Sequence, residues 1–135
     1  MRRDVNNSNK VTGSIRVISS QFKGRKLPVM DAQGLRPTTD RTKETLFNWL
    51  MADIRQSRCL DLFAGSGSLG IEALSRNASH VTFVELNKQA ATQISQNLMT
   101  LKADKSQFEV LQQDALSALQ NLKGPFDIVF LDPPF

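Results

Sequence analysis

The residues best suited to chemistry in this 135-residue chain begin with three glycines. Gly65, Gly67 and Gly70 have the spacing G-x-G-x-x-G and follow the apolar run Cys59–Phe63. Between a strand and a helix, this spacing lets the backbone approach a nucleotide closely, although a tight turn without a ligand can also require glycines. Glu85 lies 20 positions after Gly65, where a carboxylate can accept both hydroxyls of a ribose. Together these residues predict a nucleotide-containing ligand; the alternative for Glu85 is an exposed carboxylate at a strand end.

Two aspartates narrow the choice of ligand. Asp61 lies at the start of the glycine turn, where its charge would repel the pyrophosphate of a dinucleotide and attract the ammonium of a methionine group. This favours S-adenosylmethionine over a nicotinamide cofactor. Asp114 follows another apolar run and can accept a hydrogen bond from the adenine amine, or act only as the N-cap of the next helix.

The last four residues suggest the reaction. The exocyclic amine of a base is a poor nucleophile because its lone pair is delocalised into the ring. Asp132 and the carbonyl of Pro133 can accept its two N–H bonds and direct the lone pair at a methyl donor. Pro133 and Pro134 fix the direction of that carbonyl, and Phe135 offers a face for a flipped base. The alternative is a Pro-Pro strand terminator followed by a core phenylalanine.

The elements that must position these residues alternate between apolar runs and amphipathic stretches. Strands are predicted over Cys59–Phe63, Val81–Glu85, Phe108–Leu111 and Phe126–Leu131. Helices are predicted over Ser68–Arg76, after Asn87 with Ile94, Leu98 and Leu101 on one face, and over Ala115–Leu122 with Leu116, Leu119 and Leu122 together. This alternation is typical of the α/β class, a parallel sheet with helices on both faces. Ligands bind such sheets beyond the carboxyl ends of the strands, where the residues above would converge.

The first 58 residues have a different character. They carry 12 Lys and Arg against 5 Asp and Glu, whereas residues 59–135 carry 5 against 8. Segments Ser14–Ser19 and Phe22–Val29, joined through a turn at Lys23-Gly24, predict a basic β-hairpin. We expect a flexible tail over residues 1–13, the hairpin and a loop over 14–35, and the α/β core over 36–135. The side chains expected to contact phosphates are Arg16, Lys23, Arg25 and Lys26, with a merely solvated face as the alternative.

Motifs from both parts of the chain resemble those of known protein families. Asp61–Gly70, Glu85, Asp114 and Asp132–Phe135 resemble the cofactor and catalytic motifs of S-adenosylmethionine-dependent amino-methyltransferases. Gly24–Leu27 and Arg36–Phe47 look like the bacterial 16S rRNA guanine-N2 methyltransferase family. The cofactor contacts that this resemblance implies are Asp61, Phe63, Ala64, Gly65, Ser66, Gly67, Gly70, Glu85, Leu86, Asp114 and Ala115.

The resemblance also implies a Rossmann-like methyltransferase fold and a substrate. Methyl transfer would go to the exocyclic N2 amine of a guanine in 16S rRNA, within a small ribosomal subunit or its assembly intermediate. Segment Arg36–Lys43 would close over cofactor and substrate, which adds Arg36 and Arg41 to the RNA contacts. The family's sheet has seven strands, whereas four are predicted here. We therefore expect a C-terminally truncated methyltransferase whose fourth strand is an apolar edge.

Composition excludes several other classes. No apolar run reaches the ~18 residues of a membrane span, and a single cysteine, Cys59, permits neither an internal disulfide nor a zinc site. We expect a cytoplasmic, monomeric enzyme without a metal, with Cys59, Phe47, Trp49 and Leu50 in the core and His80 at the surface. Three alternatives remain at this stage: an adenine-N6 DNA methyltransferase, a nicotinamide dehydrogenase and a non-catalytic RNA-binding fragment.

Overall fold

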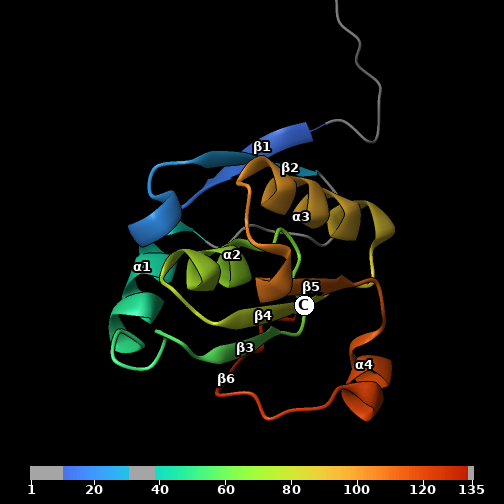
Figure 1. Ribbon diagram of the computed structural model, residues 1–135. Coiled ribbons are helices and arrows are strands. Elements are labelled where there is room, and N and C mark those ends of the chain that lie inside the picture. Colours follow the sequence, from blue (N-terminus) through green and yellow to red (C-terminus); the bar gives the residue numbers. More distant parts are fainter. Residues whose placement is uncertain (1–10, 31–38, 134–135) are drawn as a thin grey trace, which may run out of the picture.

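A four-stranded parallel sheet forms the centre of the structure (Figure 1). The computed structural model describes residues 11–30 and 39–133. The strands are β3 (Arg58–Asp61), β4 (His80–Val84), β5 (Phe108–Leu111) and β6 (Ile128–Phe130), in the order β5-β4-β3-β6. All neighbouring pairs are parallel. The predicted α/β class is confirmed, and the predicted strands lie within three residues of their observed bounds.

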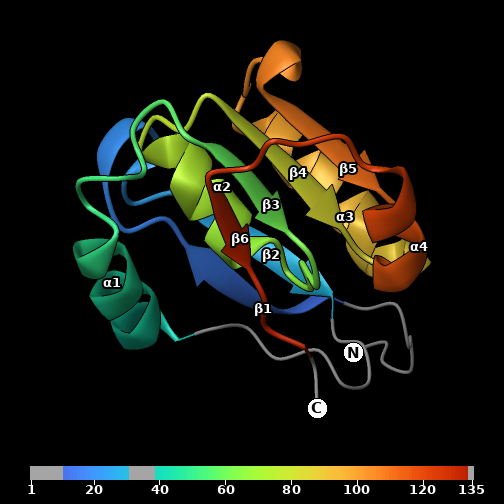
Figure 2. The ribbon, with the colours of Figure 1, turned by 90° about the horizontal axis from the view of Figure 1, so that it is seen from below.

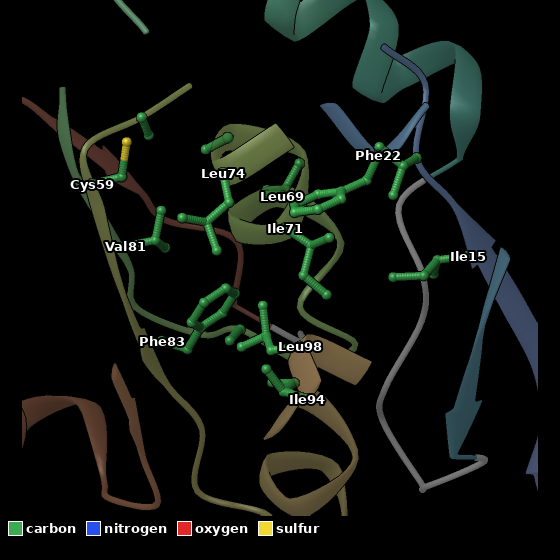
Figure 3. Close-up of a cluster of buried hydrophobic side chains, with 14 of the residues drawn as sticks. Ile15, Phe22, Cys59, Leu69, Ile71, Leu74, Val81, Phe83, Ile94 and Leu98 are labelled. Carbon is green, nitrogen blue, oxygen red and sulfur yellow. The ribbon is translucent and has the colours of Figure 1, made fainter. Parts of the chain in front are cut away.

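Two helices cover one face of the sheet, α2 (Ser68–Ser75) and α3 (Lys88–Thr100). Alternate strand residues such as Cys59, Val81 and Phe83 point toward these helices and form the larger hydrophobic cluster with them. Figure 3 shows this cluster, in which side chains of α2 and α3 surround the ring of Phe83. A side chain at Gly70 would collide with that ring, so glycine lets α2 lie directly on β4. The burial of Cys59 is confirmed, and burial raises the pKa of its thiol to about 11.

The opposite face carries the short helix α4 (Ala115–Asn121). The predicted apolar face was wrong for Leu116 and Leu119, which are 72% and 49% exposed, whereas Ala115 and Ala118 are buried. The third predicted leucine, Leu122, is half-buried and packs against the core. The alanines form a second, smaller cluster with Leu60 and Val84 of the sheet and with Leu62, which follows β3. The small side of the helix therefore faces the strands. On β6, Val129 and the following Leu131 are 50% and 65% exposed.

The antiparallel hairpin comprises β1 (Val11–Arg16) and β2 (Lys26–Met30). A 3₁₀ turn, η1 (Ser20–Phe22), occupies part of the predicted strands. The turn forms because Phe22 is buried and its backbone N–H donates to Ser75 Oγ at 2.8 Å. The first strand begins at Val11, inside the segment expected to be a tail. The hairpin lies against α3, where Asn97 Nδ2 donates to Pro28 O at 3.0 Å.

Helix α1 (Asp40–Trp49) joins the hairpin half to the sheet. Its N-cap is Thr39, whose side chain accepts a hydrogen bond from the N–H of Thr42. Phe47 is fully buried, but Trp49 is 78% exposed, so placing that residue in the core was wrong. The remaining element is the 3₁₀ turn η2 (Lys105–Gln107) before β5. Within the described ranges, no helix has the length and hydrophobicity needed to cross a membrane.

Candidate active site at the carboxyl edge of the sheet

The candidate site lies beside β3, where the order in which successive strands join the sheet reverses. From β3, the chain moves outward through β4 and β5 and then returns to pair β6 on the other side of β3. Figure 2 shows β6, β3 and β4 side by side with their arrowheads pointing in one direction. Open α/β sheets bind ligands at this switch point, beyond the carboxyl ends of the strands. Asp61 ends β3, Glu85 follows β4, and Asp132 follows β6.

The glycine turn connects β3 to α2 in a conformation that L side chains rarely adopt. Gly65 and Gly67 have φ values of 58° and 81°, and Gly67 is the N-cap of α2. A Cβ atom at Gly67 would also lie 3.0 Å from a side-chain carbon of Ile94. The glycines therefore meet both a backbone requirement and a packing requirement. The Gly65 N–H donates to Glu85 Oε1 at 2.7 Å, which fixes the turn against the end of β4.

Asp61 is a buried carboxylate with few partners. It is 1% exposed, and Oδ2 accepts a hydrogen bond from Gly70 N at 3.0 Å. Burial, followed by smaller effects of the negative charges of Asp132 and Glu85, raises the pKa of Asp61 to about 7 despite the hydrogen bond from Gly70. Among the described residues, no Lys, Arg or His forms an ion pair with Asp61. The carboxylate is thus arranged to receive a cation or further N–H donors from a ligand.

Glu85 links the glycine turn to the start of α3. It is 8% exposed, and Oε2 accepts a hydrogen bond from Asn87 N at 2.9 Å. Asn87 caps α3 through its own side chain, and the helix begins after this residue as predicted. Each carboxylate oxygen can accept more than one hydrogen bond, so these contacts leave capacity for a ligand. The structural contacts of Glu85 were not anticipated, because they depend on where the turn folds back.

The other expected cofactor contacts surround this edge. Asp114 is exposed and caps α4, with Oδ2 accepting from Ser117 N at 3.2 Å. The helix-cap reading is therefore realised, and a contact with adenine stays a prediction. Leu86 is 63% exposed immediately after Glu85. Of the remaining expected contacts, Ala64 and Ala115 are buried, and Phe63 and Ser66 are half-buried.

The expected catalytic segment follows β6. Asp132 is exposed and Pro133 is half-buried. The negative charge of Asp132 contributes to the raised pKa of Asp61. Pro134, Phe135 and Arg36 lie outside the described residues.

The basic side chains expected to contact RNA lie at the surface. Lys23, Arg25, Lys26 and Arg41 are exposed. Arg16 pairs with Asp40 of α1 at 2.8 Å, and both side chains are about half exposed. Arg25 reaches the carbonyl of Thr100 at the end of α3, at 3.5 Å.

Sequence reasoning missed a buried polar network beside the glycine turn. Lys43 of α1, 1% exposed, donates from Nζ to Ser68 Oγ at 2.8 Å and to Arg16 O at 2.7 Å. Its Nζ also lies 3.8 Å from Oε1 of the buried Glu72. Lys43 belongs to the segment expected to close over the ligands, but its side chain points into the protein. The available signal was Glu72 itself, a lone acid in the otherwise apolar and small-residue stretch of α2.

Comparison with known proteins agrees with this geometry. Residues 15–135 match the family described as Conserved hypothetical protein 95. The chain belongs to this family. It is 58% identical over 125 residues to ribosomal RNA small subunit methyltransferase D of Haemophilus influenzae, covering 91% of this chain and 65% of that protein. It is 52% identical over 124 residues to the protein of the same name from Escherichia coli, covering 92% of this chain and 62% of that one.

Solved structures show the same fold. A structure named "Putative methyltransferase yhhF from Escherichia coli" superposes with a TM-score of 0.83 at 50% identity, over 91% of this chain and 65% of that one. A structure named "Crystal structure of putative methylase HI0767 from Haemophilus influenzae" superposes with a TM-score of 0.75 at 54% identity, over 91% of this chain and 66% of that one. The Rossmann-like methyltransferase fold is thus confirmed. The chain spans just under two thirds of the length of the curated relatives named above.

Proposed function

We propose that this chain contains the cofactor-binding part of an S-adenosylmethionine-dependent methyltransferase that modifies a guanine N2 amine of 16S rRNA. The observation that carries this proposal is the set of Asp61, the glycine turn and Glu85 at the switch point of the sheet. The printed names of the relatives support rRNA of the small subunit as the substrate class. The choice of guanine N2 rests on the resemblance of the sequence motifs.

The charge distribution favours S-adenosylmethionine over a dinucleotide. Asp61 is buried within hydrogen-bond distance of the first turn of α2, where a pyrophosphate would otherwise bind. A carboxylate at this position disfavours a phosphate and favours the ammonium of a methionine group. Glu85 would accept the ribose hydroxyls, and Asp114 with Ala115 would contact adenine. Phe63, Ala64, Gly65, Ser66, Gly67, Gly70 and Leu86 would complete the contacts.

The catalytic role falls to the segment after β6. When bound, the cofactor supplies a methyl group already activated by a sulfonium. Asp132 and the carbonyl of Pro133 would accept the two N–H bonds of the guanine amine and orient its lone pair. Pro134 would fix the direction of the segment, and Phe135 would stack on the flipped base. These residues act by positioning and by accepting hydrogen bonds, without a covalent intermediate on the protein.

The basic hairpin, within residues 14–35, would contact the RNA backbone through Arg16, Lys23, Arg25 and Lys26, with Arg36 and Arg41 beside the core of residues 36–135. Phosphate contacts of this kind supply affinity and orientation, whereas the base pocket supplies specificity. We place the substrate in a small ribosomal subunit or its assembly intermediate.

A methyl-transfer assay tests the function. Small-subunit particles that lack the modification, free 16S rRNA and duplex DNA would each be incubated with radiolabelled S-adenosylmethionine and the chain. We expect label in 16S rRNA as N2-methylguanine, no label in DNA, and a loss of at least 100-fold with Asp132→Ala. Label in DNA, or unchanged transfer by the Asp132→Ala variant, would contradict the proposal.

A further inference from the structure

A buried joint connects the basic hairpin, helix α1 and the glycine turn. Its central residue is Lys43, whose Nζ donates both to Arg16 O at the end of β1 and to Ser68 Oγ in the first turn of α2. Glu72, on the next turn of α2, is fully buried and accepts from the backbone N–H groups of Ile18 and Ser19 at 2.9 and 3.2 Å. Two side chains thus attach the chain after β1 to α2. Lys43 bridges Arg16 O and Ser68, and Glu72 of α2 accepts directly from Ile18 and Ser19.

The same joint touches both parts of the candidate active site. Ser68 lies two residues before Gly70, whose N–H donates to Asp61. The ring of Phe47, one turn beyond Lys43 on α1, lies 5.6 Å from the ring of Phe130 in β6. Phe130 is two residues before Asp132. A displacement of α1 would therefore act on the end of β3 and on the end of β6.

The other end of the joint reaches the surface expected to bind RNA. Arg16 contributes its carbonyl to the buried Lys43, while its guanidinium lies at the surface in an ion pair with Asp40 of α1. A phosphate bound at that guanidinium would be separated from the Lys43 ammonium only by the atoms of one residue. Such a phosphate would compete with Asp40 for the Arg16 guanidinium or bind beside their ion pair. In either case it would alter the contact that holds the first turn of α1 to β1.

Stability alone does not account for this network. Removing a lysine and a glutamate from water is costly, and well-packed apolar residues of similar volume often do as well or better. Burial lowers the pKa of Lys43 despite the opposing charge of Glu72. Compared with an apolar contact, Lys43 and Glu72 add hydrogen bonds of fixed direction between β1, α1 and α2.

We propose that Lys43 is a positioning residue that couples RNA binding at the hairpin to cofactor binding at the glycine turn. This inference rests on the proposed function. Because one ammonium, that of Lys43, donates to both regions, each ligand restrains an arrangement that the other also needs, so the coupling is positive. Thermodynamic linkage makes it reciprocal, with RNA tightening cofactor binding by the same factor as cofactor tightens RNA binding.

Calorimetric titration of S-adenosylhomocysteine, which carries the methionine ammonium but no methyl to transfer, measures this coupling. Titrations would be made with and without a saturating 16S rRNA fragment. For the unmodified chain we expect RNA to lower the Kd of S-adenosylhomocysteine about fivefold or more. In Lys43→Met the factor should fall below about twofold, although each ligand still binds alone. Lys105→Met, which removes an exposed lysine on η2, should keep the full factor.

Two further variants separate coupling from folding. Lys43→Met/Glu72→Gln removes both charges and keeps one acceptor oxygen, which can serve either Ile18 N or Ser19 N but not both. We expect this variant to fold with reduced stability and without the coupling. Lys43→Arg keeps a buried cation with donors and should restore at least half of the coupling. Full coupling in a cooperatively melting Lys43→Met or double variant would overturn the inference, as would absent coupling in an unmodified chain that binds both ligands. Failure of the unmodified chain to bind S-adenosylhomocysteine would instead contradict the proposed function.

Discussion

Glu72 of α2 and Asp61 at the end of β3 are equally hidden from solvent, at 0% and 1% exposure, but their surroundings are opposite. Glu72 accepts from Ile18 N, Ser19 N and Arg76 Nε, the last at 2.8 Å, and lies 3.8 Å from Lys43 Nζ. Asp61 accepts from Gly70 N and forms no ion pair within the described part of the chain.

We interpret this difference as that between an acid that holds the fold together, Glu72, and an acid that we propose binds a ligand, Asp61. A buried charge is costly unless it is paired and hydrogen-bonded. Glu72 meets that condition with partners from the hairpin, α1 and α2, so it holds elements together. Asp61 does not meet it, and burial raises its pKa to about 7. An acid left in that condition at a strand end is typical of a site completed by a ligand.

The largest effect should follow removal of the structural acid. Glu72→Ala leaves Lys43 and Arg76 without their carboxylate and leaves two backbone N–H groups without an acceptor. We expect a loss of about 3–5 kcal/mol in the free energy of unfolding, measured by urea denaturation. Glu44→Ala, at an exposed position of α1, is the matched control and should change stability by less than about 0.5 kcal/mol. Equal urea midpoints for Glu72→Ala and Glu44→Ala would contradict the structural role assigned to Glu72.

A smaller effect should appear in the pH dependence of stability. Asp61 has a pKa of about 7 in the folded protein against 3.8 as its ordinary value. Between about pH 4 and 7 the folded state therefore holds a proton that the unfolded state has lost. Stability contributed by this group falls as the pH rises through that window, by at most about 1.4 kcal/mol per pH unit.

Urea midpoints at pH 5 and pH 7.5 measure this slope. Asp61→Asn removes the titrating group but keeps an acceptor for Gly70 N, so the decline from pH 5 to 7.5 should be smaller in the variant. An identical decline in both proteins would show that Asp61 is not the proton-binding group.

The smallest effect should concern the hairpin that Glu72 anchors. Arg25→Glu/Lys26→Glu reverses two exposed charges without touching either buried acid. We expect RNA affinity to fall about tenfold and its salt dependence to weaken, because two phosphate contacts are lost. Fluorescence anisotropy with a 16S rRNA fragment measures the affinity. The Kd of S-adenosylhomocysteine without RNA should stay unchanged; an equal loss of both affinities would contradict this division between hairpin and core.

Much of the fold and of the carboxyl edge was predictable because local signals determine them. The alternation of apolar runs and glycines placed Asp61 and Glu85 at strand ends, and a helix was predicted to follow Asn87, where α3 begins. These features depend on residues close in sequence. The resemblance of the motifs then supplied the fold family, which the structural comparisons confirm.

Long-range contacts account for what could not be predicted. Lys43 and Glu72 are 29 positions apart, and a charged residue read alone is assigned to the surface. Leu116, Leu119 and Leu122 suggested a buried face, but only Leu122 packs against the core, together with the alanines of α4. Similarly, Phe22 leaves the strand pattern because its N–H binds Ser75 of α2. Each case depends on a partner that periodicity does not identify.

The most direct test of Asp61 as the ligand-binding acid is calorimetric titration of S-adenosylmethionine at pH 7.5 into the unmodified chain and into Asp61→Asn, with NAD as the control ligand. A hydrogen bond to a charged group is worth about 1.5–3 kcal/mol, so we expect the variant to bind S-adenosylmethionine roughly 10- to 100-fold more weakly. NAD should bind to neither protein. Equal affinity of both proteins for S-adenosylmethionine, or saturable binding of NAD, would contradict the assignment.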